Sequence, residues 1–552
     1  MEKFYWLNDD SRTFLSRGYL SKGETPEERI RSIAETAERY LNLPGFADKF
    51  YEYMARGYYS LSSPVWANYG KTRGLPVSCF GSYIGDSMES IMYSLGENGM
   101  LMKNGGGTSG YFGAVRHRGA PITDQGESSG SVHFMQLFDT LASVVSQGSV
   151  RRGFFAAYQD IEHPDIDEFL DIATEGNPIQ GLTTSVVVSD KFIEEMKAGD
   201  ADKRRIWAKV LQRRSQLGFP YIMYGDNVNN NKPQVYKDHD MKIHAAQMCA
   251  EISLPSSEDE TFTCVLSSLN ILHWDEILHT DAIEVLTMFL DTVCEEFIQK
   301  TEGQEYLKRA RRFSINHRAL GLGVLGWHSY LQSNMIAFES EQASQKNYEI
   351  AKVLQERSYA ASRELAERLG EPPLLQGYGM RNTTTMAIAP TKSSSFILGQ
   401  VSQSIEPEFS NCYVKDLAKM KVTIKNPYLR TLLKEKQMDT PEVWESIKTR
   451  DGSVQHLNFL TQEEKDVFKT FSEIDPYTII DQAAIRQEFI DQSQSLNLIL
   501  SPNTPVREIN QLYLYAHEMG IKNLYYSYSM SAAQALTRKS LESAEGCAAC
   551  EA

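Results

Sequence analysis

The chain has 552 residues, of which 41% are hydrophobic and 23% are charged, so it is long enough to bury a large core. Its formal net charge of -16 argues against a general nucleic-acid surface, which needs a basic patch, but leaves room for local arginine sites for small phosphorylated ligands. The N-terminus lacks the apolar core of a signal peptide and no apolar run approaches membrane-spanning length, so we expect a cytoplasmic protein without nucleic-acid or membrane partners.

Helical and strand patterns alternate along the chain. Residues 25–28 (Thr-Pro-Glu-Glu) combine a capping residue, a proline at the first helical position and the glutamate of a capping box, and apolar residues follow at helical spacing. Residues 183–189 read as a buried strand, and residues 282–298 read as an amphipathic helix. The mixture favours an α/β fold, and no internal repeat is visible.

The last segment is polar and has few large apolar side chains to anchor it, although it carries Cys547 and Cys550. A flexible tail of this length can return to its own active site or present its thiols to an external reductant. We therefore expect three parts: an N-terminal helical segment at 1–60, a large α/β domain at 61–530 and a flexible tail at 531–552.

Two motifs that often mark cofactor sites have simpler interpretations here. Residues 321–326 match the dinucleotide fingerprint GxGxxG, but the basic residues at 308–313 stand where an apolar strand should precede it, so close packing through small residues is favoured. Glu276 and His279 form the only Glu-x-x-His, whereas a carboxylate di-iron centre needs two such pairs. No cysteine or histidine group has convincing zinc spacing, so we expect no metal in this chain.

The cysteines carry the most informative pattern. Seven is an odd number and is not typical of a disulfide framework, so any disulfide should be catalytic and transient. Cys249 stands two positions before Glu251, and a thiol beside a carboxylate can support hydrogen-atom and proton transfer at one substrate. Cys294 and Cys412 are interpreted as core residues, and each other internal cysteine taken alone has the same explanation. What favours a redox role is the agreement among the surroundings of Cys79, Cys249, Cys264, Cys547 and Cys550.

Through motifs spread from about Ser60 to the C-terminus, the sequence resembles the large, catalytic subunit of class I ribonucleotide reductase. The resemblance implies that Cys249 is the radical cysteine and Glu251 the acid/base. It likewise makes Cys79 and Cys264 the redox pair that supplies the reducing electrons. The terminal Cys547 and Cys550 resemble the shuttle dithiol, which thioredoxin or glutaredoxin would re-reduce.

The resemblance also extends to binding residues. Tyr525 and Tyr526 are similar to the pair that carries the radical from the small subunit, although tyrosine pairs are usually core or strand residues. The turn that follows Ala389 looks like the phosphate-binding turn of the family, with backbone N–H groups and hydroxyls at a strand-to-helix junction. The implied substrate-binding residues are Ser63, Ser78, Pro390, Thr391, Lys392, Ser393 and Ser394. Asp86 and Arg116 match the site for a deoxynucleoside triphosphate or ATP effector, where an ordinary surface pair is the alternative.

Two features depart from the family pattern. Gln247 stands where the family usually has an asparagine that contacts the ribose hydroxyls, so the amide is kept with one extra methylene. The chain begins almost directly with the helical segment, so we expect no N-terminal ATP-cone.

By resemblance, the fold is a ten-stranded α/β barrel with a central finger loop, and the protein is a homodimer that docks a small subunit holding the radical-generating metal centre. No cofactor is expected to be bound covalently in this chain. A cobalamin-dependent class II reductase is one alternative, which the tyrosine pair argues against. A non-catalytic nucleotide-binding regulatory protein is another, but it would not need the thiols and the carboxylate.

Overall fold

The computed structural model describes residues 3–123, 126–147, 151–417, 420–501 and 503–529. Three helices, α1 (Asp9–Ser16), α2 (Pro26–Leu41) and α3 (Phe46–Ala55), come before the first strand, so the predicted N-terminal helical segment is confirmed. Helix α2 begins with the predicted capping box, in which the Thr25 side chain accepts from the Glu28 amide and the Glu28 carboxylate accepts from the Thr25 amide. Its apolar face is buried against α3 and α13 (Ala282–Lys300).

A curled nine-stranded sheet organises the described part of the chain. Its strand order is β1-β9-β2-β3-β6-β7-β8-β14, and β10 pairs with β9. The strands are β1 (Tyr59–Leu61), β2 (Cys79–Tyr83), β3 (Gly107–Tyr111), β6 (Phe155–Asp160), β7 (Thr183–Val188), β8 (Tyr221–Tyr224), β9 (Phe262–Asn270), β10 (Leu320–Leu325) and β14 (Asn523–Leu524). Strands β2, β3, β6, β7 and β8 run parallel, whereas β9 is antiparallel to β2.

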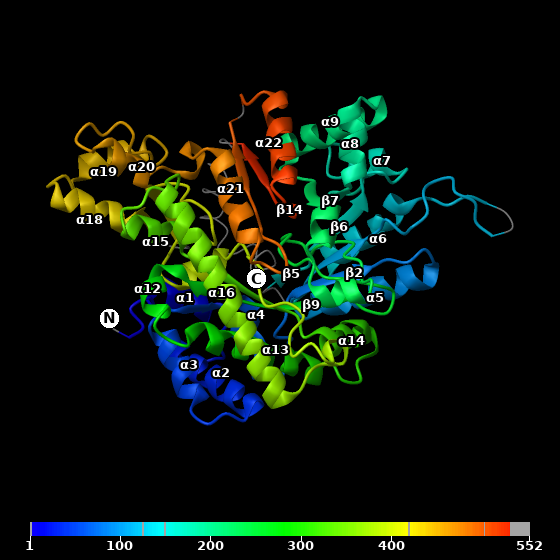
Figure 1. The fold of residues 1–552 in the computed structure, drawn as a ribbon, viewed down its shortest axis with the longest axis horizontal. Coiled ribbons are helices and arrows are strands. Elements are labelled where there is room, and N and C mark those ends of the chain that lie inside the picture. The colour runs from blue at the N-terminus through cyan, green and yellow to red at the C-terminus, as the bar shows by residue number, and fades with distance from the viewer. Residues whose placement is uncertain (1–2, 124–125, 148–150, 418–419, 502, 530–552) are drawn as a thin grey trace.

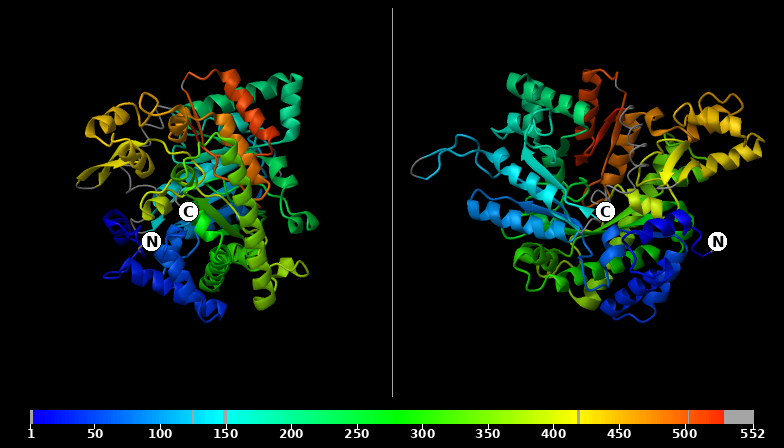
Figure 2. Two further views of the ribbon diagram at one scale, coloured as in Figure 1. Left: turned by 60° about the vertical axis from the view of Figure 1, so that its left-hand side comes forward. Right: turned by 180° about the vertical axis from the view of Figure 1, so that it is seen from behind.

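Crossover helices join the parallel strands and cover the outside of the sheet (Figure 1). These helices are α5 (Met88–Lys103), α6 (Ser131–Val144), α7 (Ile166–Phe169), α8 (Asp190–Ala198) and α9 (Ala201–Leu217). Helix α13 packs on β9 and β10, and the long α16 (Glu341–Leu369) packs on α13. The views in Figure 2 show the N-terminal helices and the α5 edge on different sides of the sheet.

The remaining elements complete the fold. The further helices are α4 (Ser63–Asn68), α10 (Gly225–Asn230), α11 (Gln234–Asp238), α12 (Trp274–Ile277), α14 (Lys308–His317), α15 (Trp327–Ser333), α17 (Lys392–Ile397), α18 (Pro427–Glu435), α19 (Pro441–Lys448), α20 (Gln462–Val467), α21 (Pro476–Gln487) and α22 (Val506–Glu518). The further strands are β4 (Ser146–Gln147), β5 (Arg151–Arg152), β11 (Cys412–Leu417), β12 (Met420–Lys425), β13 (Leu498–Leu500) and β15 (Ser527–Ser529). Helices α18, α19 and α20 share a separate apolar cluster and form an outlying lobe (Figure 1).

The α/β class and the curled sheet agree with the prediction, but the wall beyond β10 is less regular than ten full strands. It continues as single bridges, from Leu322 to Met386 and from Ile388 to Gln494. Strand β13 then pairs in parallel with β15. Among the described residues, no helix is long and apolar enough to cross a membrane.

The GxGxxG motif lies in β10, and its glycines serve packing, as predicted. A Cβ atom on Gly321 would lie 2.4 Å from Leu266 Cδ2 and 3.1 Å from the Cys264 sulfur. A Cβ atom on Gly323 would lie 2.8 Å from the backbone oxygen of Ala387, closer than real Cβ contacts allow. The motif therefore permits the chain at 386–389 to lie directly against β10.

We predict that Gly323→Ala destabilises the protein by about 1–3 kcal/mol, because the added methyl group meets backbone rather than a flexible side chain. Thermal unfolding measures this as a lower midpoint. Gln345→Ala, at an exposed position of α16, is the control and should change stability by less than about 0.5 kcal/mol. An unchanged midpoint for Gly323→Ala would show that the two segments are not held this closely.

Candidate active site

A short hairpin, which we call the finger loop (residues 246–253), presents Cys249 and Glu251 inside the barrel. Its base is an antiparallel bridge between Ala246 and Ser253, and the Gln247 amide donates to the Ile252 oxygen at 2.9 Å. Ala250 at the tip has a positive φ of 68°. Each of the eight residues is at most 2% exposed, so the loop lies entirely within the protein.

Side chains from the strands satisfy the backbone of this buried loop. Ser109 of β3 donates to the Ala246 oxygen at 2.8 Å, and Tyr158 of β6 donates to the Gln247 oxygen at 2.9 Å. Asn523 of β14 donates to the Ala250 oxygen at 2.8 Å. Because an unpaired buried backbone group costs as much as a lost hydrogen bond, these contacts fix the loop in one position.

A second element, which we call the anchoring segment (residues 491–495), holds the functional end of the loop. The Ser493 amide donates to the Glu251 oxygen at 2.9 Å. The Ser495 hydroxyl lies 2.6 Å from the backbone oxygen of Cys249 and 3.0 Å from Glu251 Oε2. Its single hydrogen is shared between these two acceptors. The radical cysteine and the acid/base predicted from sequence are therefore oriented by the same hydroxyl.

Strand pairing brings the predicted redox cysteines together. Cys79 begins β2, Cys264 lies in β9, and the two are direct partners in the antiparallel register. Directly opposed residues project to the same face with Cβ atoms about 4.5–5.5 Å apart, close to the separation of a disulfide. Both cysteines are buried and are thiols rather than a disulfide in this structure, and burial raises the pKa of Cys264 well above its usual range. Ser78 lies beside them, with its hydroxyl 3.8 Å from the Cys79 sulfur.

The finger loop and the redox pair meet through one side chain of the anchoring segment. The Gln492 amide nitrogen lies 3.3 Å from the Cys264 sulfur, and its carbonyl oxygen accepts from the Ser253 amide at 3.2 Å. The negative charge of Glu251 also contributes to the raised pKa of Cys264. Gln492 therefore links Cys264, and through strand pairing Cys79, to the loop that carries Cys249 and Glu251.

Two buried polar atoms of the finger loop have no hydrogen-bond partner among the described residues: Glu251 Oε1 and Gln247 Nε2. Burial raises the pKa of Glu251 to about 7. The hydrogen bond from Ser495 and the neighbouring Gln247 side chain act in the opposite direction and lower this pKa, but burial has the larger effect. The Gln247 carbonyl accepts from the Cys249 amide at 2.9 Å. The longer amide thus braces the loop and keeps its nitrogen available.

Tyr525 and Tyr526, as predicted from sequence, lie next to each other, with ring centroids 4.5 Å apart. Two further tyrosines that the sequence did not reveal join them. The Tyr221 ring is 4.7 Å from Tyr525 and 5.1 Å from Tyr526, and Tyr528 stacks on Tyr526 at 5.4 Å. Tyr525 belongs to the same apolar cluster as Cys249, so the aromatic group lies beside the finger loop.

The predicted phosphate-binding residues lie at the start of α17. Pro390 precedes Thr391, which has a positive φ of 54°, and Lys392, Ser393 and Ser394 make the first turn of the helix. The Thr391 hydroxyl accepts from the Ser404 amide at 2.7 Å, while the Ser394 oxygen accepts from the Ser60 hydroxyl at 2.7 Å.

Ser63 and the two predicted effector residues lie in other parts of the fold. Ser63 starts α4 and accepts a hydrogen bond from Tyr19 at 3.3 Å. Asp86 follows β2, Arg116 follows β3, and the Arg116 guanidinium donates to the Asp86 carboxylate at 2.8 Å. Parallel strands bring this pair together on the surface, where both side chains are more than a third exposed. Cys547 and Cys550 lie outside the described residues.

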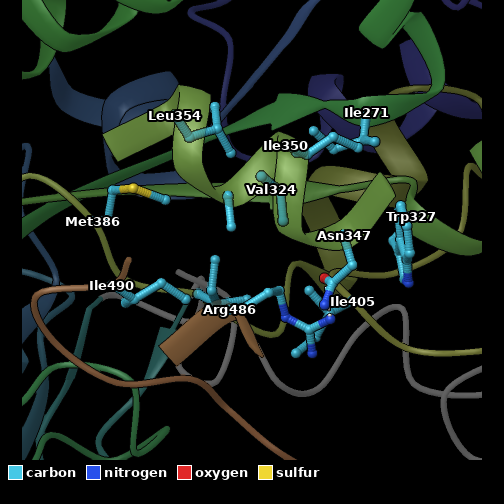
Figure 3. Close-up of a pocket in the computed structure, with 12 residues that line it drawn as sticks. Ile271, Val324, Trp327, Asn347, Ile350, Leu354, Met386, Ile405, Arg486 and Ile490 are labelled. Carbon is cyan, nitrogen blue, oxygen red and sulfur yellow. Dashed lines mark hydrogen bonds between the residues drawn. The ribbon is translucent and has the colours of Figure 1, made fainter. Parts of the chain in front are cut away.

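A small cavity, drawn in Figure 3, contains none of the predicted site residues. Its lining is mostly apolar, and the Arg486 guanidinium lies at one end, where it donates to Asn347 and to Gln494 at 2.8 and 2.9 Å. Within the residues described, no group of three or more histidine, cysteine, aspartate or glutamate side chains is arranged to hold a metal ion.

Comparison with known proteins agrees with this geometry. The family model described as "Ribonucleotide reductase, barrel domain" matches residues 77–203, 198–376 and 373–527. The model described as "Ribonucleotide reductase, all-alpha domain" matches residues 5–74. The chain belongs to the ribonucleotide reductase large subunits. The ten-stranded barrel predicted by resemblance therefore corresponds to the curled sheet described above.

Named relatives define the class of this ribonucleotide reductase. The ribonucleoside-diphosphate reductase large subunit of Invertebrate iridescent virus 3 is 31% identical over 93% of this chain and 92% of its own length. The large chain of Schizosaccharomyces pombe is 28% identical over 97% of this chain and 74% of its own. The class Id alpha subunit of Actinobacillus ureae is 58% identical, with a TM-score of 0.92 over 98% of this chain and 100% of its own. The protein is thus the large subunit of a class I ribonucleoside-diphosphate reductase, an oxidoreductase.

The raised pKa of Glu251 predicts a pH-dependent effect on stability. Below its ordinary pKa of 4.5, Glu251 is protonated in both states, whereas between 4.5 and about 7 the folded protein keeps a proton that the unfolded chain has lost. The stability present below pH 4.5 is therefore lost as the pH rises through 7. We predict that Glu251→Gln stabilises the protein by on the order of 2–3 kcal/mol more at pH 8 than at pH 5.

Thermal unfolding at both pH values measures this difference. Glu89→Gln, which removes an exposed carboxylate on α5, is the control and should show equal midpoint changes at the two pH values. Equal changes for Glu251→Gln would mean that its carboxylate is hydrated in the folded protein.

Proposed function

We propose that Cys249 is the thiyl radical that starts ribonucleotide reduction, that Glu251 is the acid/base, and that Cys79 and Cys264 are the reductants. The observation that carries this proposal is the shared site: the opposed cysteine pair of β2 and β9, and a buried loop that presents the other two groups, both bound by the anchoring segment. Thiol and carboxylate groups at these places meet the needs of hydrogen-atom, proton and electron transfer.

The proposed steps balance atoms and electrons. The Cys249 radical takes the 3' hydrogen atom and becomes a thiol, while Glu251 accepts the 3'-hydroxyl proton. The 2'-hydroxyl takes a proton from the redox pair and leaves as water. Cys79 and Cys264 supply two electrons and two protons in total and end as a disulfide: one proton leaves in the water molecule, and the other proton and the two electrons form the new C2'–H bond. Cys249 then returns its hydrogen atom to C3' and Glu251 returns its proton to the 3' oxygen, which restores the Cys249 radical and the Glu251 carboxylate.

The unpartnered atoms of the site support a ribose between these groups. Glu251 Oε1 and Gln247 Nε2 are a buried acceptor and a buried donor without a hydrogen-bond partner in the described part of the chain, and sugar hydroxyls would satisfy both. With a pKa of about 7, Glu251 is suited to exchange protons at neutral pH. We propose that Gln247 takes the role of the usual asparagine at the ribose.

Further contacts would hold the rest of the substrate. We propose that the diphosphate binds the turn formed by Pro390, Thr391, Lys392, Ser393 and Ser394, with Ser63 and Ser78 contributing hydroxyl groups. The amides and hydroxyls of this turn, together with one lysine, offer donors and positive charge to an anion.

We propose that Tyr526 and Tyr525 carry the radical inward from the docked small subunit, whose metal centre would supply the oxidising equivalent. The contact between their rings and the proximity of Tyr525 to the finger-loop cluster support this route. Cys547 and Cys550, in a tail at 531–552, would then reduce the Cys79–Cys264 disulfide by thiol exchange and be reduced in turn by thioredoxin or glutaredoxin. Cysteines that are thiols rather than disulfides in the described part of the chain, together with nucleotide substrates, fit a cytoplasmic location.

We propose the division into a helical segment at 1–60, a catalytic barrel at 61–530 and the tail.

Asp86 and Arg116 would bind a deoxynucleoside triphosphate or ATP effector close to a homodimer contact. Asp86 stands two residues before α5, and α5 packs beside α6. Together these helices expose Met88, Met92, Leu137 and Val144, with 39% to 74% of each residue accessible. An apolar face of this kind fits an interface between two copies of the chain.

The radical role predicts that Cys249→Ser abolishes deoxynucleotide formation, because the serine O–H bond is too strong to be broken to form the radical. Nucleotide binding should stay within about twofold. Product formation with the small subunit and binding of cytidine diphosphate are the two measurements. Cys294→Ser is the matched control, since Cys294 is also a buried thiol but lies on α13 and contacts the Ser314 oxygen at 3.9 Å. Turnover by the Cys249→Ser variant would eliminate the proposed role.

For the interface, Met92→Lys combined with Leu137→Lys should convert the dimer to a monomer, because two charges would enter the apolar face. Native mass measurement reports the oligomeric state. Leu369→Lys, at an exposed apolar position on α16, is the control and should leave the dimer intact. A dimer that persists in the double variant would place the contact elsewhere.

A further inference from the structure

We infer that Gln492 is a positioning residue that holds the Cys264 thiol and ties the redox pair to the finger loop. This inference rests on the proposed function, because it takes Cys79 and Cys264 to be the reducing pair. Gln492 lies 228 residues from Cys264 along the chain, and its side chain is fully buried.

Both ends of the Gln492 amide are used. Its oxygen accepts from the Ser253 amide in the finger loop at 3.2 Å. Its nitrogen lies 3.3 Å from the Cys264 sulfur and 3.0 Å from both the Leu320 oxygen and the Thr384 hydroxyl. An amide nitrogen has only two hydrogens for these three acceptors. The contacts to the Leu320 and Thr384 oxygens fix the orientation of the Gln492 amide plane. The Cys264 sulfur shares the N–H donors that these two contacts hold in place.

The backbone around Gln492 is also fixed. Its amide donates to the Met386 oxygen, and its own oxygen accepts from Gln487 Nε2 at 2.9 Å. Beside it, the Asp491 carboxylate accepts from the Thr385 amide at 2.6 Å and from the Met386 amide at 3.2 Å. The Gln492 side chain therefore contacts the Cys264 sulfur from a backbone held by hydrogen bonds. A residue with a purely local packing role would not need such a backbone.

This contact has a chemical consequence. A donor aimed at sulfur stabilises the thiol and, more strongly, the thiolate that forms during exchange, whereas a disulfide sulfur is a weaker acceptor. Gln492 thus favours the reduced pair and keeps the Cys264 sulfur aimed into the site. Because the oxygen of the same side-chain amide accepts from the finger loop, movement of β9, which carries Cys264, relative to Cys249 is restricted.

The test uses the full chain with Cys547→Ser and Cys550→Ser, so that the tail does not exchange with the internal pair. The protein is equilibrated with mixtures of reduced and oxidised dithiothreitol, alkylated, and analysed by mass spectrometry for the Cys79–Cys264 disulfide. Gln492→Met keeps the length of the side chain and removes the donor. We expect this variant to need a ratio of reduced to oxidised dithiothreitol roughly three- to tenfold higher before half of the Cys79–Cys264 disulfide is reduced.

Gln492→Glu provides a second variant, since it keeps the shape and the acceptor for Ser253. Its carboxyl can donate to sulfur only when protonated, so its shift in the ratio should grow between pH 6 and pH 8. In dithiothreitol-supported turnover of the same tail-serine background with the small subunit, both variants should lower kcat and leave KM for cytidine diphosphate within about twofold. Gln487→Met is the matched control, because it removes the contact to the Gln492 backbone and touches no thiol.

A ratio unchanged within twofold in Gln492→Met, or an equal shift in Gln487→Met, would overturn the positioning role. If Gln492→Met does not fold, a pH-independent ratio in Gln492→Glu overturns it instead. If the tail-serine background forms no Cys79–Cys264 disulfide, the proposed function itself fails, and the two failures are thereby distinguished.

Discussion

The structure depends on satisfying the polar groups of a loop that lies wholly inside the protein. The finger loop at residues 246–253 exposes almost no surface, so each of its N–H and carbonyl groups must find a partner within the barrel. Serine, tyrosine and asparagine side chains from β3, β6 and β14 provide partners on one side, and residues 491–495 provide them on the other. Among the residues that the structure describes, Glu251 Oε1 and Gln247 Nε2 are left without a partner, and we propose that the substrate supplies it.

The irregular wall of the barrel follows from the same requirement. The chain at 386–388 and 490–495 is held by single bridges and a few backbone hydrogen bonds rather than by regular ladders, and the side chains of Gln492 and Ser495 contact the finger loop. Close approach at Gly321 and Gly323 brings residues 386–389 against β10. The turn at 390–394 and the anchoring segment are therefore supported by packing rather than by long strands.

Sequence reasoning predicted the α/β class, the N-terminal helices and the packing role of the glycines, because capping, periodicity and local context determine them. It assigned Cys79, Cys249 and Cys264 to one site through the resemblance to a family, and the register of β2 and β9 gives the pairing of Cys79 with Cys264 a physical basis. It did not find Gln492 or Ser495. These residues form no local motif and lie about 240 residues from the finger loop in sequence, so only the folded chain brings them to it. Tyr221 was missed for the same reason, since a tyrosine in a strand is ordinarily a core residue.

We propose that the opposed thiols of β2 and β9 supply the electrons for a radical chemistry started at Cys249. Disulfide mapping after a single round of turnover without external reductant, in the chain whose tail cysteines are replaced by serine, tests this proposal. We expect one Cys79–Cys264 disulfide for each deoxynucleotide formed, with Cys249 remaining a thiol. Product formed without that disulfide, or a disulfide that includes Cys249, would contradict it.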